Sequence, residues 1–332
     1  DEAHHVLQDN KWGKAAKLFP NARGLGVTAT PVRADGKGLG LHADGLFEQM
    51  FVGPTMRELI DQGYLTDYKV YAPPSDLDLT GVAISAGGDF NHDQLAAARK
   101  KSRITGDVVQ HYLRLARGKR GVTFDTDVES ATKTAAEFRA AGVPAEVVSG
   151  TTPDALRADV LRRFKQGEVL QLVNVDLFGE GFDLPAIEVV SFARPTMSFA
   201  LFAQQFGRSL RRLDGKSWAI IIDHVGNTLL HGLPDAARVW SLDRRERRGS
   251  GRPNDVIPTR VCLNVVCNGV YERVHASCPY CGHTPVPAGR SSPELVDGDL
   301  HELDAETLRR TRGVEQQLDG MPFYPANPSA ES

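Results

Sequence analysis

Several features are missing from the sequence. No apolar run of about 18 residues, the length at which a membrane-spanning helix becomes credible, occurs in the 332 residues. The first residues are charged and polar, so we expect no signal peptide at this position. The first residue is Asp1 rather than Met, which suggests that the chain does not begin at a natural start. We therefore expect a cytoplasmic protein without a membrane partner.

Cysteine is scarce, with four residues in the whole chain. In a chain of cytosolic character and this length, so few cysteines indicate a metal site rather than a disulfide framework. An excess of either charge is also missing, because 39 Lys and Arg stand against 42 Asp and Glu and the net charge is −3. This balance excludes a wholly basic nucleic-acid coat but leaves room for a local basic groove.

The composition is that of a soluble globular protein, with 41% hydrophobic and 24% charged residues. The length suits about two domains. From about residue 104 to 225, short apolar segments alternate with amphipathic ones. We expect strands at 121–124, 145–148, 169–175, 187–193 and 218–223, and helices at 104–116, 128–141, 153–165 and 198–213. This alternation predicts an α/β fold with a buried parallel sheet and helical crossovers.

Outside that region the pattern is weaker. We expect a buried strand at 24–30, a short helix at 56–61, a helix at 302–317, and Thr152 as the N-cap of the helix at 153–165. Residues 73–100 contain Pro and Gly pairs and are weakly patterned, which is typical of a linker or insertion.

Two short motifs near the start of the chain carry possible chemistry. In Asp1-Glu2-Ala3-His4, one acid can hold Mg²⁺ while the other orients or deprotonates a water. In Thr28-Ala29-Thr30-Pro31, two hydroxyls at a strand end can relay hydrogen bonds between a phosphate site and a neighbouring domain. Taken singly, a solvated acidic chain end and an ordinary strand exit explain these residues as well.

Two further motifs follow in the regular region. The segment 174–185 ends a strand with glycines and acids, among them Gly179, Gly181 and Asp183, and ligands bind at the carboxyl ends of parallel strands. In the helix expected at 198–213, Gln204, Arg208 and Arg211 share one face, roughly opposite an apolar stripe. Arginine forks suit phosphate groups, although a solvated basic face is the simpler alternative.

Taken together, the order of these motifs resembles the C-terminal half of a superfamily 2 helicase. Asp1–His4 resembles motif II, Thr28–Thr30 motif III, residues 122–124 motif IV, residues 174–185 motif V, and residues 204–211 the Gln-x-x-Gly-Arg-x-x-Arg of motif VI. The resemblance covers about residues 1–235 and is strongest to RadD-type bacterial repair helicases and related phage helicases. Residues 179–185, the segment Ile222-Asp223-His224-Val225-Gly226-Asn227 and the later cysteines add to it.

The resemblance implies roles for these residues. Asp1 is expected to hold Mg²⁺, and Glu2 to position the attacking water. His4 and Gln204 are expected to couple two motor lobes, with Arg208 and Arg211 reaching the γ-phosphate of ATP. Thr28, Thr30, Gly179, Gly181 and Asp183 are the expected nucleotide-binding or nucleotide-sensing residues. DNA is the expected partner, held mainly through its phosphates.

One motif of the family is missing. A helicase motor needs Gly-x-x-x-x-Gly-Lys-Ser/Thr to bind phosphate through backbone N–H groups and a lysine. The one Gly-Lys-Ser, at Gly215-Lys216-Ser217, has Leu210 where the first glycine belongs and lies after motif VI. We therefore expect this chain, as an N-terminally truncated motor, to hydrolyse ATP barely or not at all by itself.

The four cysteines follow as Cys262-x4-Cys267 and Cys278-x2-Cys281. Pairs at this spacing, each followed closely by a glycine, predict a structural Cys₄ zinc ribbon whose folding depends on the metal. His275 and His283 are possible substitute ligands, but four cysteines already complete the shell. The ribbon could contact DNA, because arginines flank it, or dock a protein partner, as could the acidic tail.

The sequence thus predicts RecA-like helicase lobes, the first partial and the second complete, plus a zinc ribbon. The expected boundaries are 1–72 for the first-lobe remnant, 73–103 for a linker or insertion, 104–243 for the second lobe, 244–257 for a basic linker, 258–290 for the ribbon and 291–332 for an acidic tail. Two alternatives stay open: the motor subunit of a restriction system, and a non-catalytic module that binds nucleic acid or protein.

Overall fold

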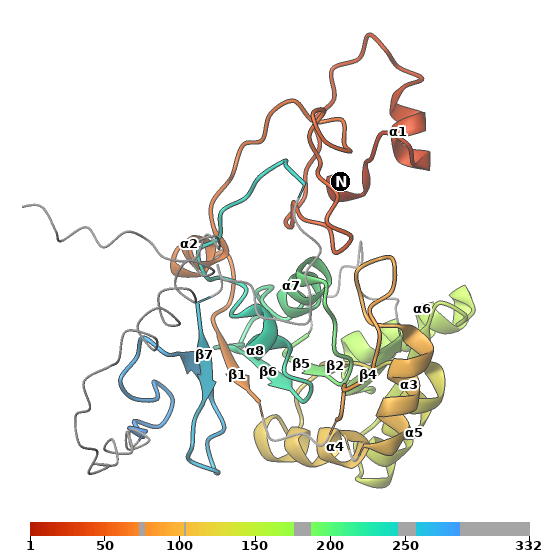
Figure 1. Ribbon diagram of the computed structural model, residues 1–332. Helices are drawn as coiled ribbons and strands as arrows, with labels where there is room; N and C mark the ends of the chain where they lie inside the picture. The colour runs from red at the N-terminus through yellow and green to blue at the C-terminus, as the bar shows by residue number, and fades with distance from the viewer. Residues whose placement is uncertain (73–76, 103, 176–186, 245–256, 286–332) are drawn as a thin grey trace, which may run out of the picture. The chain divides into compact units, whose positions relative to one another are not determined.

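The computed structural model describes residues 1–72, 77–102, 104–175, 187–244 and 257–285, all within one compact unit spanning Asp1–Pro285. Its centre is a six-stranded sheet in the order β1-β6-β5-β2-β4-β3 (Figure 1). The strands are β1 (Tyr68–Tyr71), β2 (Gly121–Phe124), β3 (Ala145–Ser149), β4 (Gln171–Val175), β5 (Val189–Phe192) and β6 (Ala219–Asp223). Every neighbouring pair is parallel, which confirms the predicted α/β class.

Helices α4 (Ile104–Leu115) and α5 (Val128–Ala140) cover one face of this sheet, and α6 (Asp154–Gln166) and α7 (Phe199–Gly207) cover the other. The other described helices are η1 (Ala3–His5), α1 (Lys11–Ala16), α2 (Met56–Asp61), α3 (His92–Lys101) and α8 (Asn227–His231). On one face, Tyr112 of α4 meets Phe138 of α5 edge to face, with ring centroids 5.4 Å apart. On the other face, α6 and α7 bury their phenylalanines against the strands.

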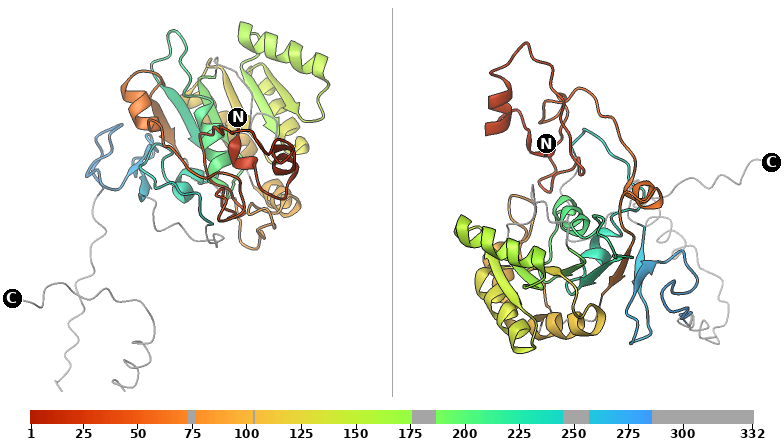
Figure 2. Two further views of the ribbon diagram at one scale, coloured as in Figure 1. Left: turned by 90° about the horizontal axis from the view of Figure 1, so that it is seen from above. Right: turned by 180° about the vertical axis from the view of Figure 1, so that it is seen from behind.

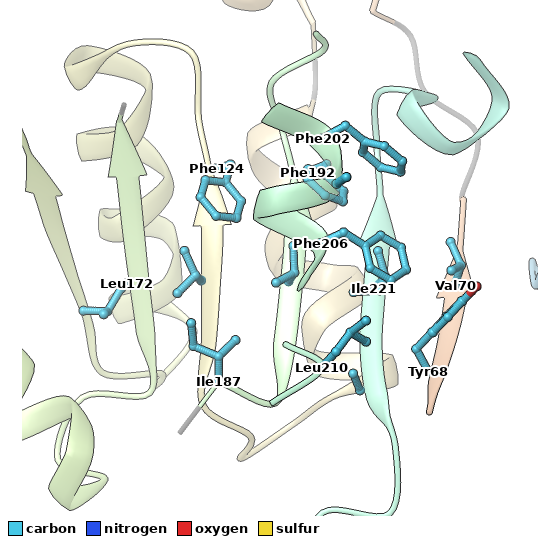
Figure 3. Close-up of a cluster of buried hydrophobic side chains, with 14 of the residues drawn as sticks. Tyr68, Val70, Phe124, Leu172, Ile187, Phe192, Phe202, Phe206, Leu210 and Ile221 are labelled. Atoms are coloured by element: carbon cyan, nitrogen blue, oxygen red, sulfur yellow. The ribbon is translucent and has the colours of Figure 1, made fainter. Parts of the chain in front are cut away.

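Figure 3 shows how α7 and the turn after it are seated. Phe202, Phe206 and Leu210 reach toward Phe192 of β5 and Ile221 of β6, and all five side chains are fully buried. The predicted apolar stripe of this segment therefore faces the core. Burying each such side chain stabilises the fold by roughly 1.5–3 kcal/mol, which ties α7 firmly to the sheet.

Local signals set several helix ends. Asp127 begins α5 by accepting a hydrogen bond from the Ser130 N–H (2.8 Å), and Gly142, with φ 77°, follows the end of that helix. The cap expected at Thr152 is not formed. Its Oγ1 instead accepts from the Ser149 N–H (2.9 Å), so the hydroxyl closes the turn before α6 rather than the helix itself.

The strand expected at 24–30 is absent. Leu25 exposes 91% of its surface and Val27 51%, and the Val27 carbonyl accepts one backbone hydrogen bond, from Ala3 (3.0 Å). A strand needs neighbours that satisfy its backbone and cover its apolar side chains. Among the residues that the structure describes, no strand lies beside this segment, so it runs as an extended loop.

Several other segments also differ from the sequence-based expectation. The segment expected as a linker or insertion contains α3, which Asn91 caps. The sequence pattern predicts no strand at 68–71, yet β1 pairs with β6 there. The helix expected to reach residue 213 ends at Gly207, so the residues that follow form a turn. None of the described helices is long and apolar enough to cross a membrane. The helix predicted at 302–317 lies outside the described residues.

Candidate functional site

Four side chains from three distant segments form a connected polar cluster. Gln204 of α7 donates a hydrogen bond from Nε2 to Oε2 of Glu2 (3.2 Å). The same oxygen lies 3.4 Å from Nδ1 of His4, and that ring nitrogen lies 2.9 Å from Oγ1 of Thr28. His4 is buried, whereas Glu2 and Gln204 are half-buried and open on one side to solvent. The structure therefore brings together one residue or more from each of motifs II, III and VI.

The backbone at Glu2 has an uncommon conformation. Its φ of 53° and ψ of 44° place it in the left-handed region, which residues other than glycine rarely adopt. Its N–H donates to Oδ1 of the exposed Asp1 (2.9 Å), while Nη1 of Arg33 donates to the carbonyl of His4 (3.0 Å) and anchors the segment. Such local strain within a polar cluster is a common property of functional sites.

The arginines of motif VI lie beyond the helix. The Ser198 hydroxyl begins α7 by accepting from the backbone N–H three residues on, and the helix ends at Gly207. Arg208 and Arg211 therefore belong to the turn after α7. Arg208 is buried, with 8% of its surface exposed, and Arg211 is half-buried. The sequence pattern predicts that helical periodicity places these two arginines on one face of a helix. In the structure their placement depends instead on this turn.

The start of α7 is held by residues to which the sequence analysis assigned no role. Asp89 accepts from the Thr196 hydroxyl and from the Met197 N–H, both at 2.7 Å. The Asn227 carboxamide accepts from the Thr196 N–H (3.0 Å) and donates to the Arg194 carbonyl (3.1 Å). No local signal identifies Asp89, because its partners lie 107 and 108 residues away in the sequence.

A buried cluster of charged and titratable side chains lies where β2 and β6 end. Nε of Arg99 lies 3.3 Å from Oδ1 of Asp125, and the Thr134 hydroxyl donates to Oδ2 of the same carboxylate (2.8 Å). Burial raises the pKa of Asp125, against the effect of Arg99 and the hydrogen bonds. His224 stacks on His111 with ring centroids 5.2 Å apart, and burial, helped by the charges of His111 and Arg99, lowers the pKa of His224 to about 3.

The predicted nucleotide residues of motif V and motif III differ in whether the structure describes them. Gly179, Gly181 and Asp183 lie outside the described residues, as do most of the basic linker and all of the tail. The strands that flank the motif V segment are described: β4 ends at Val175 and β5 begins at Val189. Thr30, the second hydroxyl of motif III, is buried, and its N–H donates to the Thr28 hydroxyl (3.2 Å).

Four sulfur atoms converge beside a small antiparallel hairpin, β7 (Thr259–Val261) and β8 (Val270–Glu272). The Sγ atoms of Cys262, Cys267, Cys278 and Cys281 all lie within 4.8 Å of one another. Two of the separations are 3.6 Å, between Cys262 and Cys281, and 3.8 Å, between Cys267 and Cys278. A tetrahedral zinc ion with Zn–S bonds of ~2.3 Å separates its sulfurs by about 3.8 Å, so this donor set fits zinc.

The chemistry of these thiols agrees with a metal site. Burial raises the pKa of Cys267 to about 12, so a nearby positive charge is needed to keep it as the thiolate that metals bind. The exposed His275 and the half-buried His283 do not belong to the metal-ligand group found among the described residues. Four sulfurs complete a tetrahedral shell and leave no position for a reacting water.

The β7–β8 hairpin packs against the outer edge of β1, as both Figure 1 and Figure 2 show. The Ala72 N–H donates to the Asn268 carbonyl (3.1 Å), and Tyr71 forms an antiparallel bridge with Gly269. Gly269 fits only without a side chain, since a Cβ there would lie 2.0 Å from the Tyr280 ring. The ribbon thus continues the hydrogen bonding of the sheet past its edge strand.

Comparison with known proteins shows that the chain is similar to helicases. Residues 105–212 match the family model described as the helicase conserved C-terminal domain. A 51.5 kDa protein of a Lactococcus phage (isolate 7-9) is 35% identical over 317 residues, which cover 93% of this chain and 66% of that protein. A protein of Saccharomyces cerevisiae provisionally named ATP-dependent helicase IRC3 is 28% identical over 234 residues, covering 68% of this chain and 33% of that protein.

Among solved structures, a fragment of a provisionally assigned HsdR subunit of a type I restriction enzyme from Vibrio vulnificus is similar in fold. The two share 24% identity with a TM-score of 0.51, over 65% of this chain and 42% of that one. The present chain therefore spans about two thirds of the phage protein and a smaller part of the other two.

Proposed function

Because this chain belongs to the superfamily 2 helicases, with the RecA-like α/β fold of their C-terminal lobes, we propose that it is the second motor lobe, with part of the first, of an ATP-dependent DNA helicase or translocase. The complete motor would couple ATP hydrolysis to movement on DNA or to its unwinding. The observation that carries this proposal is the Gln204–Glu2 hydrogen bond, which joins motif VI to motif II.

The cluster suits the chemistry of nucleotide hydrolysis. Glu2 is half-buried, and its carboxylate contacts both Gln204 and His4, so it can orient a water while its own position is held from two sides. Asp1, exposed and adjacent, is the proposed ligand of Mg²⁺. Arg208 and Arg211 would neutralise charge on the γ-phosphate, an effect that contributes roughly 10³–10⁵ to the rate in related motors.

The phosphate loop has to come from a segment or chain other than these 332 residues, because none of them form the required run. We therefore propose that the chain by itself hydrolyses little or no ATP. Gly179, Gly181 and Asp183 would complete the nucleotide site from the motif V loop. Nucleic acid would lie across both lobes and be held through its phosphates.

Zinc is the proposed metal of the cysteine cluster, on the strength of the sulfur separations. Its role would be structural. The zinc ribbon would begin at the expected boundary at residue 258 and would be a separate segment that packs against the second lobe. A place in DNA repair or replication, of the RadD type, rests on the sequence resemblance alone. A restriction motor remains the alternative, and the likeness to HsdR concerns only the fold.

The proposal is tested by ATP hydrolysis in a protein that joins this chain to a helicase lobe with a phosphate loop. Turnover stimulated by single-stranded DNA is expected, together with a loss of roughly 10³-fold on Arg208→Ala. The exposed Arg162→Ala on α6 serves as a control that keeps the activity. If the joined protein is folded and binds DNA but hydrolyses no ATP, the non-catalytic module is the correct assignment.

A further inference from the structure

Lys216 lies in the Gly-Lys-Ser sequence that does not form a phosphate loop, and its side chain has a different set of partners. Its Nζ donates to the carbonyls of Ser209 (2.8 Å), Ile187 (3.2 Å) and Arg211. Gly215, with φ 79°, makes the turn that brings the lysine back toward them. The side chain is half-buried, and burial lowers the pKa of Lys216 to about 8, so the amine is still protonated, with three donors, near pH 7.

The three acceptors belong to two different motifs. Ser209 and Arg211 lie in the turn of motif VI, after the end of α7. Ile187 is the first described residue after the motif V segment, and its side chain is buried in the core on the same side of the sheet as Leu210 (Figure 3). One ammonium group therefore joins the exit of motif V to the turn that carries Arg208 and Arg211.

This joint is more than a helix cap. A lysine near a helix end can bond the last carbonyls of its own helix, but Ile187 belongs to another segment, 29 residues earlier in the sequence. A second residue supports the same turn, because the Thr66 N–H donates to the Leu210 carbonyl (2.7 Å). Since α7 ends at Gly207, these outside bonds decide the course of the backbone from which Arg208 and Arg211 project.

We propose that Lys216 is a positioning residue of the motor, which holds the motif VI turn against the strand after motif V so that the two nucleotide segments keep one relative placement. The effect of Lys216 on catalysis rests on the proposed function. The hydrogen bonds by which Lys216 joins the two segments do not depend on it. The charges of Glu188 and Lys119 act on the pKa of Lys216, and these two groups pair with each other (2.9 Å), while the hydrogen bonds of the lysine go to the three carbonyls.

The first test measures amide hydrogen exchange of this chain by mass spectrometry. Lys216→Met keeps the length of the side chain but removes its donors, and exchange of the amides at 207–213 is expected to rise about tenfold for the lost hydrogen bonds. Exchange in β2 and β4 should stay unchanged. Lys216→Arg keeps donors and should retain most of the protection. Lys119→Met removes a neighbouring, partly exposed lysine that pairs with Glu188, and should leave 207–213 as in the parent chain.

The second test measures steady-state ATP hydrolysis of the same variants in the protein joined to a phosphate-loop lobe. Lys216→Met is expected to lower kcat roughly 10²-fold, the cost of a slight misplacement of catalytic groups, with the KM for ATP within about twofold of its original value. Lys216→Arg should restore most of the kcat, and Lys119→Met should leave it unchanged.

The outcomes separate the inference from the proposed function. Unchanged exchange at 207–213 in a folded Lys216→Met protein overturns the joint itself. Faster exchange with an unchanged kcat, while Arg208→Ala still abolishes turnover, overturns the positioning role and leaves the motor intact. If no variant and no parent protein hydrolyses ATP, the motor proposal fails, and the positioning role fails with it even where the exchange data establish the joint.

Discussion

Nε2 of Gln204 and Oε2 of Glu2 lie 3.2 Å apart in a hydrogen bond between residues separated by 202 positions in the sequence. The bond places a helix of the second lobe against the acidic motif at Asp1–His4. Through His4 it continues to Thr28, so three motifs share one polar cluster. A change in the position of α7 therefore shifts a hydrogen-bond partner of the proposed catalytic carboxylate.

Replacing Gln204 with Met should break this coupling while keeping the size of the side chain. In the protein joined to a phosphate-loop lobe, we expect kcat for ATP to fall roughly 10–100-fold, because Glu2 loses the donor that orients it. Gln166→Met, on the outer face of α6, is the matched control and should leave kcat unchanged. Equal kcat values for the Gln204 variant and the parent protein would show that the contact has no catalytic consequence.

Removing the metal should loosen the edge of the sheet as well as the ribbon. We expect a chelator, or Cys281→Ser, to release one zinc ion per chain and to speed amide exchange at Ala72, which donates to Asn268 of the ribbon. With backbone hydrogen bonds worth about 1 kcal/mol each, the lost edge contacts should lower the free energy of unfolding by roughly 2–3 kcal/mol.

The control for metal binding is His275→Ala, which changes an exposed residue of the ribbon outside the sulfur cluster. This variant should keep both the metal and the protection of Ala72. Metal analysis that finds no zinc in protein purified without chelators would contradict the assignment of the site.

His224 should make the protein less stable in mild acid. Its pKa is lowered to about 3 in the folded chain, from an unfolded value near ~6.5, so the unfolded state binds more protons between these two values. The free energy of unfolding should then fall as the pH drops below ~6.5, by up to about 1.4 kcal/mol per pH unit from this group.

Urea unfolding at pH values between 7 and 5 measures this slope. The buried carboxyls of Asp125 and Asp223, whose pKa values burial raises, act in the opposite direction, so the slope of each variant is compared with that of the parent protein, which carries the same carboxyls. His224→Gln should flatten the dependence, and His92→Gln, at an exposed position on α3, should not. A slope that survives in the His224 variant would assign the effect to another group.

Breaking the Arg99–Asp125 pair should be costly, because both side chains are at most 1% exposed. Asp125→Leu leaves a buried guanidinium without its carboxylate, and we expect a loss of about 3–5 kcal/mol in the free energy of unfolding. The double variant Arg99→Met, Asp125→Leu should recover much of it. If the double variant is no more stable than the single one, the cost comes from packing and not from the unpaired charge.

Much of the fold could be predicted from local sequence. The apolar strands and amphipathic helices between residues 104 and 223 lie close to where periodicity places them, because their burial is written into alternating side-chain types. The cysteine spacing likewise predicts the sulfur cluster, since residues a few positions apart in a tight turn must lie close together. Motif order identified the family for the same reason, as each motif is local.

What depended on distant partners could not be predicted. Residues 24–30 have the composition of a buried strand, but among the described residues no strand pairs with them. β1 exists because β6 on one side and the ribbon on the other satisfy its backbone. α7 ends at Gly207, and the turn that carries Arg208 and Arg211 is bound by Lys216 and Thr66 from other segments, which no local pattern indicates.

By itself, the sequence determined the α/β class, the helicase motifs and the grouping of the four cysteines, because these are properties of neighbouring residues. Only the tertiary structure decided that Glu2 meets Gln204, that the ribbon extends the sheet at β1, and that the lysine of an apparent phosphate-loop fragment instead binds backbone carbonyls. Each of these contacts joins segments whose approach is set by the packing of the whole core, and no local pattern encodes that packing.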